Sequence, residues 1–396
     1  MNKVLQTTNT ILNNSKVSLT LIACAILFFV IIRNGYVLYS YSVRETLVQE
    51  DDVLAYMVSA ESLVKDPLMQ STSYTTYKDA LHRDPDLKST LVMKRDNAIT
   101  VQYHILWSSV VAFLNHGMGF GYESIMWFLS IAGQLCFLIV FLHILRSLSF
   151  TLIESSLAVV LYSLTFTRVK EFIVMNPREW AAILFMFIMG FAFSVGKQHF
   201  SKWKMVVIIC LSICGTLMHP RFILLSPIVY LFLLAQYIKF ADMRNDTIRF
   251  SIAMTLPIVL VVIVEKIFAF YGFPFLGFSS KYSASRNLDS LSISLFISNF
   301  KHATSLIMHY MDGFTIMVYD GFVWACVGLV CAYKYQKRLF LFAICLMIML
   351  FMSLFLHFHE SYPAQYFRMY NSILVVLIVL LVTKGFVFLF KTLGRS

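Results

Sequence analysis

Three consecutive acidic residues, Glu50, Asp51 and Asp52, open a stretch whose apolar residues can share one face of a helix. A carboxylate placed here can act as a general base that removes a proton from a hydroxyl group, or it can bind a metal ion. The same acids can instead serve only to favour the beginning of a helix, where free N–H groups attract negative charge. Both interpretations stay open on this stretch alone, although three acids in a row are more than a helix start requires.

Three arginines lie at the borders of apolar runs, beside proline or aromatic residues: Arg178 in Pro-Arg-Glu-Trp, Arg221 in His-Pro-Arg, and Arg368 in Tyr-Phe-Arg. The apolar run 205–218 before Arg221 would measure about 21 Å as a helix, less than the hydrocarbon core of about 30 Å. We therefore expect Arg221 to face a polar cavity or an anionic partner. A phosphate is a suitable partner because guanidinium binds it bidentately, whereas snorkelling to lipid headgroups is the simpler alternative.

His357, His359 and Glu360 form a third polar group, close to the last apolar run. Together with Asp51 they contain ligand types of a divalent cation such as Mg²⁺ or Mn²⁺, but no fixed spacing supports a metal site. A hydrogen-bonded loop, in which His359 or Glu360 contacts a substrate, is the favoured interpretation, and it requires no cofactor. The chain has no Walker loop, dinucleotide-binding glycine motif, GxSxG or HExxH motif. This disfavours an ATP-driven pump, a redox enzyme with a soluble cofactor and a zinc protease.

These polar groups are set in a very apolar chain of 396 residues, of which 59% are hydrophobic and 13% are charged. An average soluble domain contains about 25% charged residues, and its surface cannot hide so much apolar area. The seven cysteines lie in apolar runs and predict neither a disulfide framework nor a zinc site. The composition therefore predicts an all-α polytopic membrane protein and excludes a disordered, collagen-like or disulfide-rich secreted chain.

About ten apolar runs are candidates for transmembrane helices in a single integral membrane domain, residues 1–396. The first span, 17–33, has no cleavage site after it and is interpreted as uncleaved. A long outer loop, 34–121, follows and contains an amphipathic helix after Asp52 and an interrupted apolar piece, 99–114. The remaining spans lie within 122–390, at 122–145, 150–167, 180–196, 205–218, 222–238, 250–272, 314–333, 339–357 and 369–390.

The distribution of charge decides how the chain is threaded through the membrane. If the N-terminus is cytoplasmic and 99–114 is a juxtamembrane helix, the inner segments hold fifteen basic and three acidic residues, or +12. The outer segments hold sixteen basic and seventeen acidic residues, or −1. Every short inner loop is then basic, as the positive-inside rule requires. This topology puts both termini in the cytoplasm, and it relates the net charge of +11 to the lipid bilayer and not to nucleic acid.

The order of these motifs along nearly the whole chain resembles that of the C-type glycosyltransferase superfamily (GT-C). In that superfamily an acidic pair opens a long outer loop after the first span, and a juxtamembrane helix leads to the second span. An Arg–acid turn, a basic–Pro turn and an Arg–aromatic motif then open later spans. The corresponding segments here are Asp51-Asp52 with Tyr56, the helix near 103–114, Pro177-Arg178-Glu179-Trp180, His219-Pro220-Arg221 and Tyr366-Phe367-Arg368.

The resemblance implies a GT-C-like, inverting glycosyltransferase of the bacterial inner membrane, with its active site on the periplasmic face. The implied donor is a sugar linked to polyprenyl phosphate, and the acceptor is a glycan, lipid or protein of the cell envelope. A lipid-phosphate leaving group needs no nucleotide site, which agrees with the absence of nucleotide motifs from the sequence.

The resemblance also implies roles for single residues. Asp51 or Asp52 is the expected catalytic base, with Glu50 as a third candidate. Arg178, Arg221 and Arg368 are expected to bind the donor phosphate and to stabilise the charge that develops on it. Residues expected close to the substrates are Tyr56, Glu179, His219, His359, Glu360 and Tyr366.

Departures from the GT-C pattern leave the subfamily and the sugar open. The juxtamembrane helix lacks a Pro-Pro pair, Asn371 stands where many relatives have proline, and no large C-terminal soluble domain is expected. Two other functions are weighed against a transferase. An O-antigen-type polymerase or ligase usually has its main outer loop later in the chain. A flippase or transporter for a lipid-linked sugar would line a path with charges, and Glu265–Lys266 is the only such pair well inside a predicted span.

Overall fold

The computed structural model describes residues 15–44, 60, 63–64, 105–164, 177–196, 200–219, 221–239, 243–270, 297, 301, 321–356 and 363–393. Over these residues the chain forms eleven continuous α-helices and one π-helical turn and contains no β-strand, which confirms the all-α prediction. Four helices are long and apolar enough to cross a membrane, at Lys16–Tyr39, Tyr122–Ser147, Arg244–Phe268 and Ile373–Phe390. The chain thus has the character of a helical membrane protein, while the full number of ten crossings stays a prediction.

Ten of the α-helices coincide with the ten apolar runs of the sequence, because an apolar segment in lipid satisfies its backbone hydrogen bonds within one helix. Several begin before the apolar run does, since the first turn of a helix tolerates polar residues. The ten helices are α2 (Ser15–Arg44), α7 (Tyr122–Ser147), α8 (Leu152–Leu164), α9 (Pro177–Ser194), α10 (Lys202–Met218), α11 (Arg221–Lys239), α12 (Arg244–Phe270), α14 (Gly321–Tyr335), α15 (Lys337–Leu356) and α16 (Pro363–Leu393).

The first helix is longer than predicted, which corrects the boundary of the first span. The sequence predicts that this span ends at Arg33, where a charged side chain interrupts the apolar run. In the structure α2 continues to Arg44, and its apolar segment extends to Tyr39. Arg33 does not end this segment because its side chain is buried against neighbouring helices, with 2% of its surface exposed.

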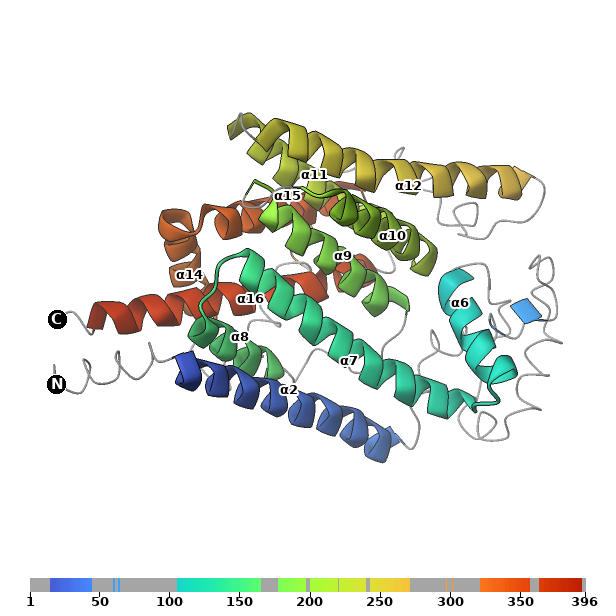
Figure 1. Ribbon diagram of the computed structural model, residues 1–396, viewed down its shortest axis with the longest axis horizontal. Helices are drawn as coiled ribbons and strands as arrows, with labels where there is room; N and C mark the ends of the chain where they lie inside the picture. Colours follow the sequence, from blue (N-terminus) through green and yellow to red (C-terminus); the bar gives the residue numbers. More distant parts are fainter. Residues whose placement is uncertain are drawn as a thin grey trace.

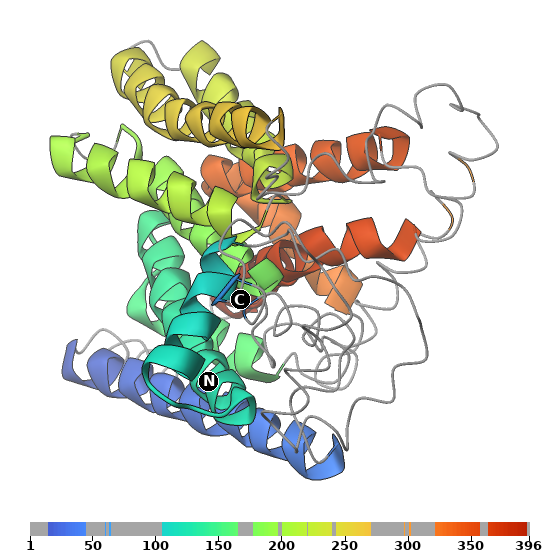
Figure 2. The ribbon, with the colours of Figure 1, turned by 90° about the vertical axis from the view of Figure 1, so that its right-hand side faces the viewer.

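The helices run back and forth between two ends of the bundle (Figure 1). α2 begins and α16 ends at one end, called here the termini end; α6 (Ile105–Ala112) and the π-helical turn η1 (Phe113–Gly117) lie at the other, the α6 end. Figure 2 views the molecule from the α6 end, with α2 along the lower edge and α12 at the top. Apolar side chains on these two peripheral helices are exposed, among them Leu27, Ile31 and Leu256, as expected of faces that contact lipid.

A helix, α6, lies within the segment for which the sequence predicts a juxtamembrane helix, and it packs against α10. Its eight described residues measure about 12 Å, far less than the roughly 30 Å of the hydrocarbon core. η1 and Gly119 then lead the chain into α7. Gly119 has a φ of +76°, a backbone conformation that glycine adopts without strain because it has no Cβ atom. Residues 99–104 lie outside the described part of the chain, and the prediction that 99–114 does not cross the membrane stays a prediction.

A group of aromatic rings joins α2, α7 and α8. The ring centroids of Phe29 and Phe137 are 6.3 Å apart, those of Phe137 and Tyr162 are 4.4 Å apart, and those of Phe29 and Tyr162 are 6.2 Å apart. All three side chains are buried. Aromatic pairs at such distances contribute about 0.5–1.5 kcal/mol each beyond the area that they bury. These rings therefore hold α2 against the rest of the bundle.

Two glycines bring α14 and α16 into close contact. A Cβ atom added at Gly328 would overlap the backbone carbonyl group of Leu381, and one at Gly385 would lie 2.8 Å from the carbonyl oxygen of Trp324. The rings of Trp324 and Phe386 stack beside them, with centroids 4.5 Å apart. Small residues at a helix interface let two backbones approach, which favours helix association in lipid. The contact between α14 and α16 therefore depends on glycine at these positions.

Gly328→Ala is expected to destabilise the protein, because the added methyl group meets backbone atoms that cannot turn aside. Overpacking of this kind costs about 1–3 kcal/mol. The matched control is Gly35→Ala in α2, where an added Cβ meets nothing within 4 Å. Replacing this helical glycine should stabilise by about 0.5–1 kcal/mol. Unfolding of the detergent-purified variants, followed by circular dichroism, measures both effects, and equal effects would contradict the close packing of α14 on α16.

Candidate functional site

The structure describes the predicted site residues to different extents. Arg178, Glu179 and His219 have described side chains, whereas Arg221, Tyr366 and Arg368 lie on helices of which the structure describes the backbone at these positions. Among the described residues, no three His, Cys, Asp or Glu side chains are grouped so that they could hold a metal ion. The candidates for the base, three of the expected substrate contacts and the ligands for Mg²⁺ or Mn²⁺ lie outside the described residues: Glu50, Asp51, Asp52, Tyr56, His357, His359 and Glu360.

The first turn of α9 carries the Pro-Arg-Glu-Trp motif. Pro177 starts the helix, a position where its missing N–H is not needed for a helical hydrogen bond. Glu179 lies in the same turn, where the helix dipole favours a carboxylate, and its side chain is 3% exposed. Arg178 is partly buried, and the indole N–H of Trp180 has no hydrogen-bond acceptor among the described residues. One helical turn thus presents a carboxylate, a guanidinium group and an indole donor.

A tight turn between α10 and α11 contains His219. Its backbone is extended and ends α10; its N–H donates to the carbonyl of Gly215 at 3.1 Å, and its carbonyl accepts from the N–H of Phe222 at 2.9 Å. The imidazole is buried, with 5% of the residue exposed. α10 has 17 residues and measures about 26 Å, which is longer than its apolar run but still shorter than the hydrocarbon core of about 30 Å.

The packing of α9 brings these two motifs to the same end of the bundle as the beginning of α16. α9 packs against α10, α11 and α16. α9 and α16 begin, and α10 ends, toward the α6 end (Figure 1). The backbone positions of Arg178, Arg221 and Arg368 therefore lie toward one end of the bundle, although the three residues are far apart in the sequence.

Such an arrangement can bind an anion and move a proton. Guanidinium groups bind phosphate oxygens in charge-assisted hydrogen bonds. A buried imidazole or carboxylate can accept a proton from a hydroxyl group or orient that group. The described members of the arrangement with these abilities are Arg178, Glu179 and His219.

A second polar group, which is not among the candidate sites predicted from the sequence, lies deeper in the bundle. The Nε of Arg33 on α2 donates to Oε1 of Gln134 on α7 at 3.3 Å, and its guanidinium carbon lies 5.3 Å from the ring centroid of Tyr162 on α8. The signal available in the sequence is a polar residue inside an apolar run, because such residues are costly in lipid and are commonly functional. The sequence does not pair Arg33 with Gln134, since 101 positions separate them.

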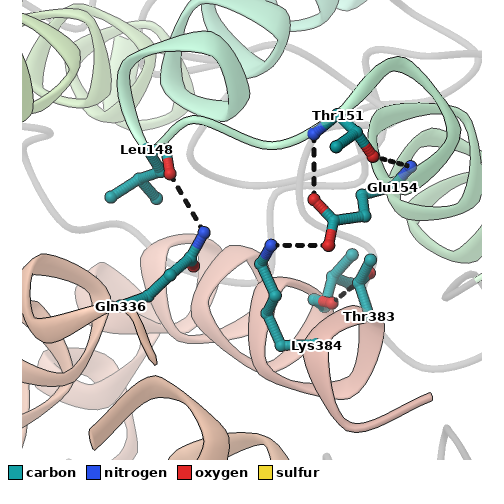
Figure 3. A network of polar contacts seen from close by, with 7 residues as sticks. Leu148, Thr151, Glu154, Gln336, Thr383 and Lys384 are labelled. Atoms are coloured by element: carbon teal, nitrogen blue, oxygen red, sulfur yellow. Dashed lines mark hydrogen bonds and ion pairs between the residues drawn. The ribbon is translucent and has the colours of Figure 1, made fainter. Parts of the chain in front are cut away.

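The polar network at the termini end joins helix ends to one another (Figure 3). Thr151 and Glu154 form a capping box at the start of α8: the Thr151 N–H donates to Oε2 of Glu154 at 2.9 Å, and the Glu154 N–H donates to Oγ1 of Thr151 at 3.2 Å. Lys384 of α16 forms an ion pair with Glu154 at 2.8 Å, and Gln336 donates to the carbonyl of Leu148 at 3.1 Å. Both charged groups have protein partners, so this network stabilises the bundle.

We expect the two single replacements of Glu154 and Lys384 to lose, in sum, more unfolding free energy than the variant in which both residues are replaced. Glu154→Gln or Lys384→Met leaves one charge where the side chains are only 7% and 12% exposed, respectively. Leaving such a charge without its partner costs about 3 kcal/mol. The double variant should lose at least about 1 kcal/mol less than the sum of the two single losses. Unfolding of the four proteins measures this cycle, and additive losses would show that the two charges do not interact.

The chain matches no family model, no curated protein and no solved structure. Its function is therefore inferred from its own residues and their arrangement.

Proposed function

We propose that this chain is an integral membrane glycosyltransferase that moves a sugar from a polyprenyl-phosphate donor to a glycan, lipid or protein acceptor of the cell envelope. The observation that carries the proposal is the shared position of Arg178, Arg221 and Arg368 toward the α6 end of the bundle. Three guanidinium groups from separate helices supply the charge that a lipid phosphate requires. The buried side chains of Glu179 and His219 in the same turns add groups that can contact a sugar.

The proposed reaction moves the anomeric carbon of the sugar from a phosphate oxygen to a hydroxyl oxygen of the acceptor. Asp51 or Asp52 takes the hydroxyl proton while the acceptor oxygen forms the new bond to the anomeric carbon. The bond from that carbon to the phosphate oxygen breaks, and its electron pair leaves with the polyprenyl phosphate. Arg178, Arg221 and Arg368 stabilise the charge on this leaving group. Attack on the face opposite the phosphate inverts the configuration of the sugar.

A lipid-linked donor also suits the surroundings of this end of the bundle. The peripheral helices α2 and α12 present exposed apolar side chains, such as Leu38 and Leu260, along which a prenyl chain can lie. The phosphate then reaches the arginines from the membrane while the sugar stays at the outer surface. Such a donor brings its own leaving group, so the reaction uses no nucleotide.

Sugar transfer by the purified full-length protein in lipid nanodiscs tests the proposal. The assay offers a panel of radiolabelled polyprenyl-phosphate sugars with acceptors extracted from cell envelopes. The expected result is transfer that falls about 100-fold or more in Asp51→Asn, Asp52→Asn or both, since a general base contributes about that much. Arg178→Gln, Arg221→Gln and Arg368→Gln should each lower the rate by a similar factor, because each removes a donor to the developing charge.

Arg146→Gln is the matched control, because it removes an exposed arginine from the last turn of α7, at the termini end. This variant should transfer sugar at the rate of the unmodified protein. Transfer that survives in the protein carrying both Asp51→Asn and Asp52→Asn would remove these residues from the role of base. Movement of an intact lipid-linked sugar across a liposome bilayer, with no new glycosidic bond, would show that the protein is a flippase and not a transferase.

A further inference from the structure

Arg33 is a charged group in the apolar part of a membrane helix. It lies six positions before Tyr39, the last residue of the apolar segment of α2, which corresponds to about 9 Å along the helix axis. Only 2% of its surface is exposed. A guanidinium group withdrawn from water loses its hydration, and a protein keeps such a group where partners or a ligand compensate for the loss.

The described surroundings of Arg33 do not neutralise its charge. Its contacts are a hydrogen bond from Nε to the neutral amide of Gln134 and the ring of Tyr162. Over the part of the chain that the structure describes, no carboxylate forms an ion pair with it; the ion pair found there joins Lys384 to Glu154. The guanidinium group has five N–H donors, and the described residues provide an acceptor for one of them.

Gln134 provides another donor at the same place. Its Oε1 accepts from Arg33, whereas its Nε2 is buried and has no hydrogen-bond acceptor among the described residues. The residue is 1% exposed. A buried donor without an acceptor is unfavourable, so this amide also calls for an oxygen atom that the described protein does not supply. Both groups therefore lack an oxygen acceptor, and Arg33 in addition lacks a partner of opposite charge.

We propose that Arg33 and Gln134 form a binding position for the phosphate group of a polyprenyl-phosphate lipid, between α2, α7 and α8. The proposal rests on the proposed function for the identity of the lipid, and it adds a position to that of the three arginine motifs. A phosphate supplies a negatively charged partner for Arg33 and oxygen acceptors for the N–H groups of Arg33 and Gln134. The opposite face of α2 carries Leu27, Ile31 and Leu38, which are 58–60% exposed, so the position is one helix away from lipid.

Gln134→Glu tests this position without removing Arg33. The new carboxylate would lie at the distance of the present amide and pair with Arg33, so it should preserve or raise the unfolding temperature and compete with the phosphate. The probe is a polyprenyl phosphate without sugar, titrated into the full-length protein in detergent while the unfolding temperature is measured. The unmodified protein should show a rise in this temperature that saturates. In Gln134→Glu and Arg33→Gln the half-saturating concentration should rise about tenfold or more.

Gln236→Glu on α11 is the matched control for the same substitution. Gln236 is also 1% exposed, and neither atom of its amide has a hydrogen-bond partner among the described residues. A carboxylate there gains no cation among the contacts that the structure describes, so Gln236→Glu should lower the unfolding temperature and leave the half-saturating concentration unchanged. The proposal would be supported if Gln134→Glu preserves or raises the unfolding temperature while Gln236→Glu lowers it, and if only Gln134→Glu weakens binding of the polyprenyl phosphate.

Three results would overturn the proposal. One is an unchanged half-saturating concentration in Gln134→Glu. Another is an equal rise in unfolding temperature with the polyprenol that lacks phosphate, which would assign binding to the prenyl chain. The third is an equal rise with inorganic phosphate that is lost in Gln134→Glu, which would assign the position to a free anion.

Because the probe carries no sugar, the binding measurement tests this position and the transfer assay tests the proposed function, so either proposal can be refuted without the other. Polyprenyl phosphate that binds through Arg33 in a protein unable to transfer sugar would refute the proposed function and keep this position. Sugar transfer in a protein whose Gln134→Glu variant binds the lipid normally would refute this position alone.

Discussion

The hydrocarbon core of a membrane offers no hydrogen-bond partners, and this constraint acts on the polar groups within the apolar helices of the bundle. Long apolar helices satisfy the backbone internally, and side chains complete the turns at their ends. Arg338 donates to the carbonyl groups of Phe193 and Val195, where α9 ends. Within helices, hydroxyl groups donate hydrogen bonds to carbonyl groups of the preceding turn, as Thr383 does to the carbonyl of Val379 at 2.7 Å. Polar groups that remain without such partners are therefore informative.

The two ends of the bundle differ in this respect. At the termini end, Glu154 and Lys384 neutralise each other, and the capping box uses the remaining carboxylate oxygen. Toward the α6 end lie the backbone positions of three arginine motifs. Deeper in the same bundle, the donors of Arg33 and Gln134 outnumber the acceptors that the described residues provide. The polar contacts described at the termini end therefore stabilise the bundle, whereas the arginine motifs toward the other end are where we propose that an anionic ligand binds.

Helix packing in this protein relies on shape, since lipid is as apolar as the side chains that it surrounds. The chain contains 37 phenylalanines, and several of them pack between neighbouring helices. Phe29 and Arg33 are one turn apart on α2, as Phe137 and Gln134 are on α7, so each pair shares a helix face. The aromatic contacts that hold α2 in place therefore also hold Arg33 beside Gln134.

The sequence by itself determined where the helices form, because the stability of a helix in lipid depends on the hydrophobicity of its own segment, which is a local property. It also predicted the short helix before α7 and pointed to Arg178, Glu179 and His219, whose residue types are unusual at the borders of apolar runs. It misplaced the end of the first span, since only the helices around Arg33 show that its charge is buried. The pairing of Arg33 with Gln134, and of Glu154 with Lys384, was decided by the tertiary structure, because such contacts depend on which helix faces meet and not on spacing along the chain.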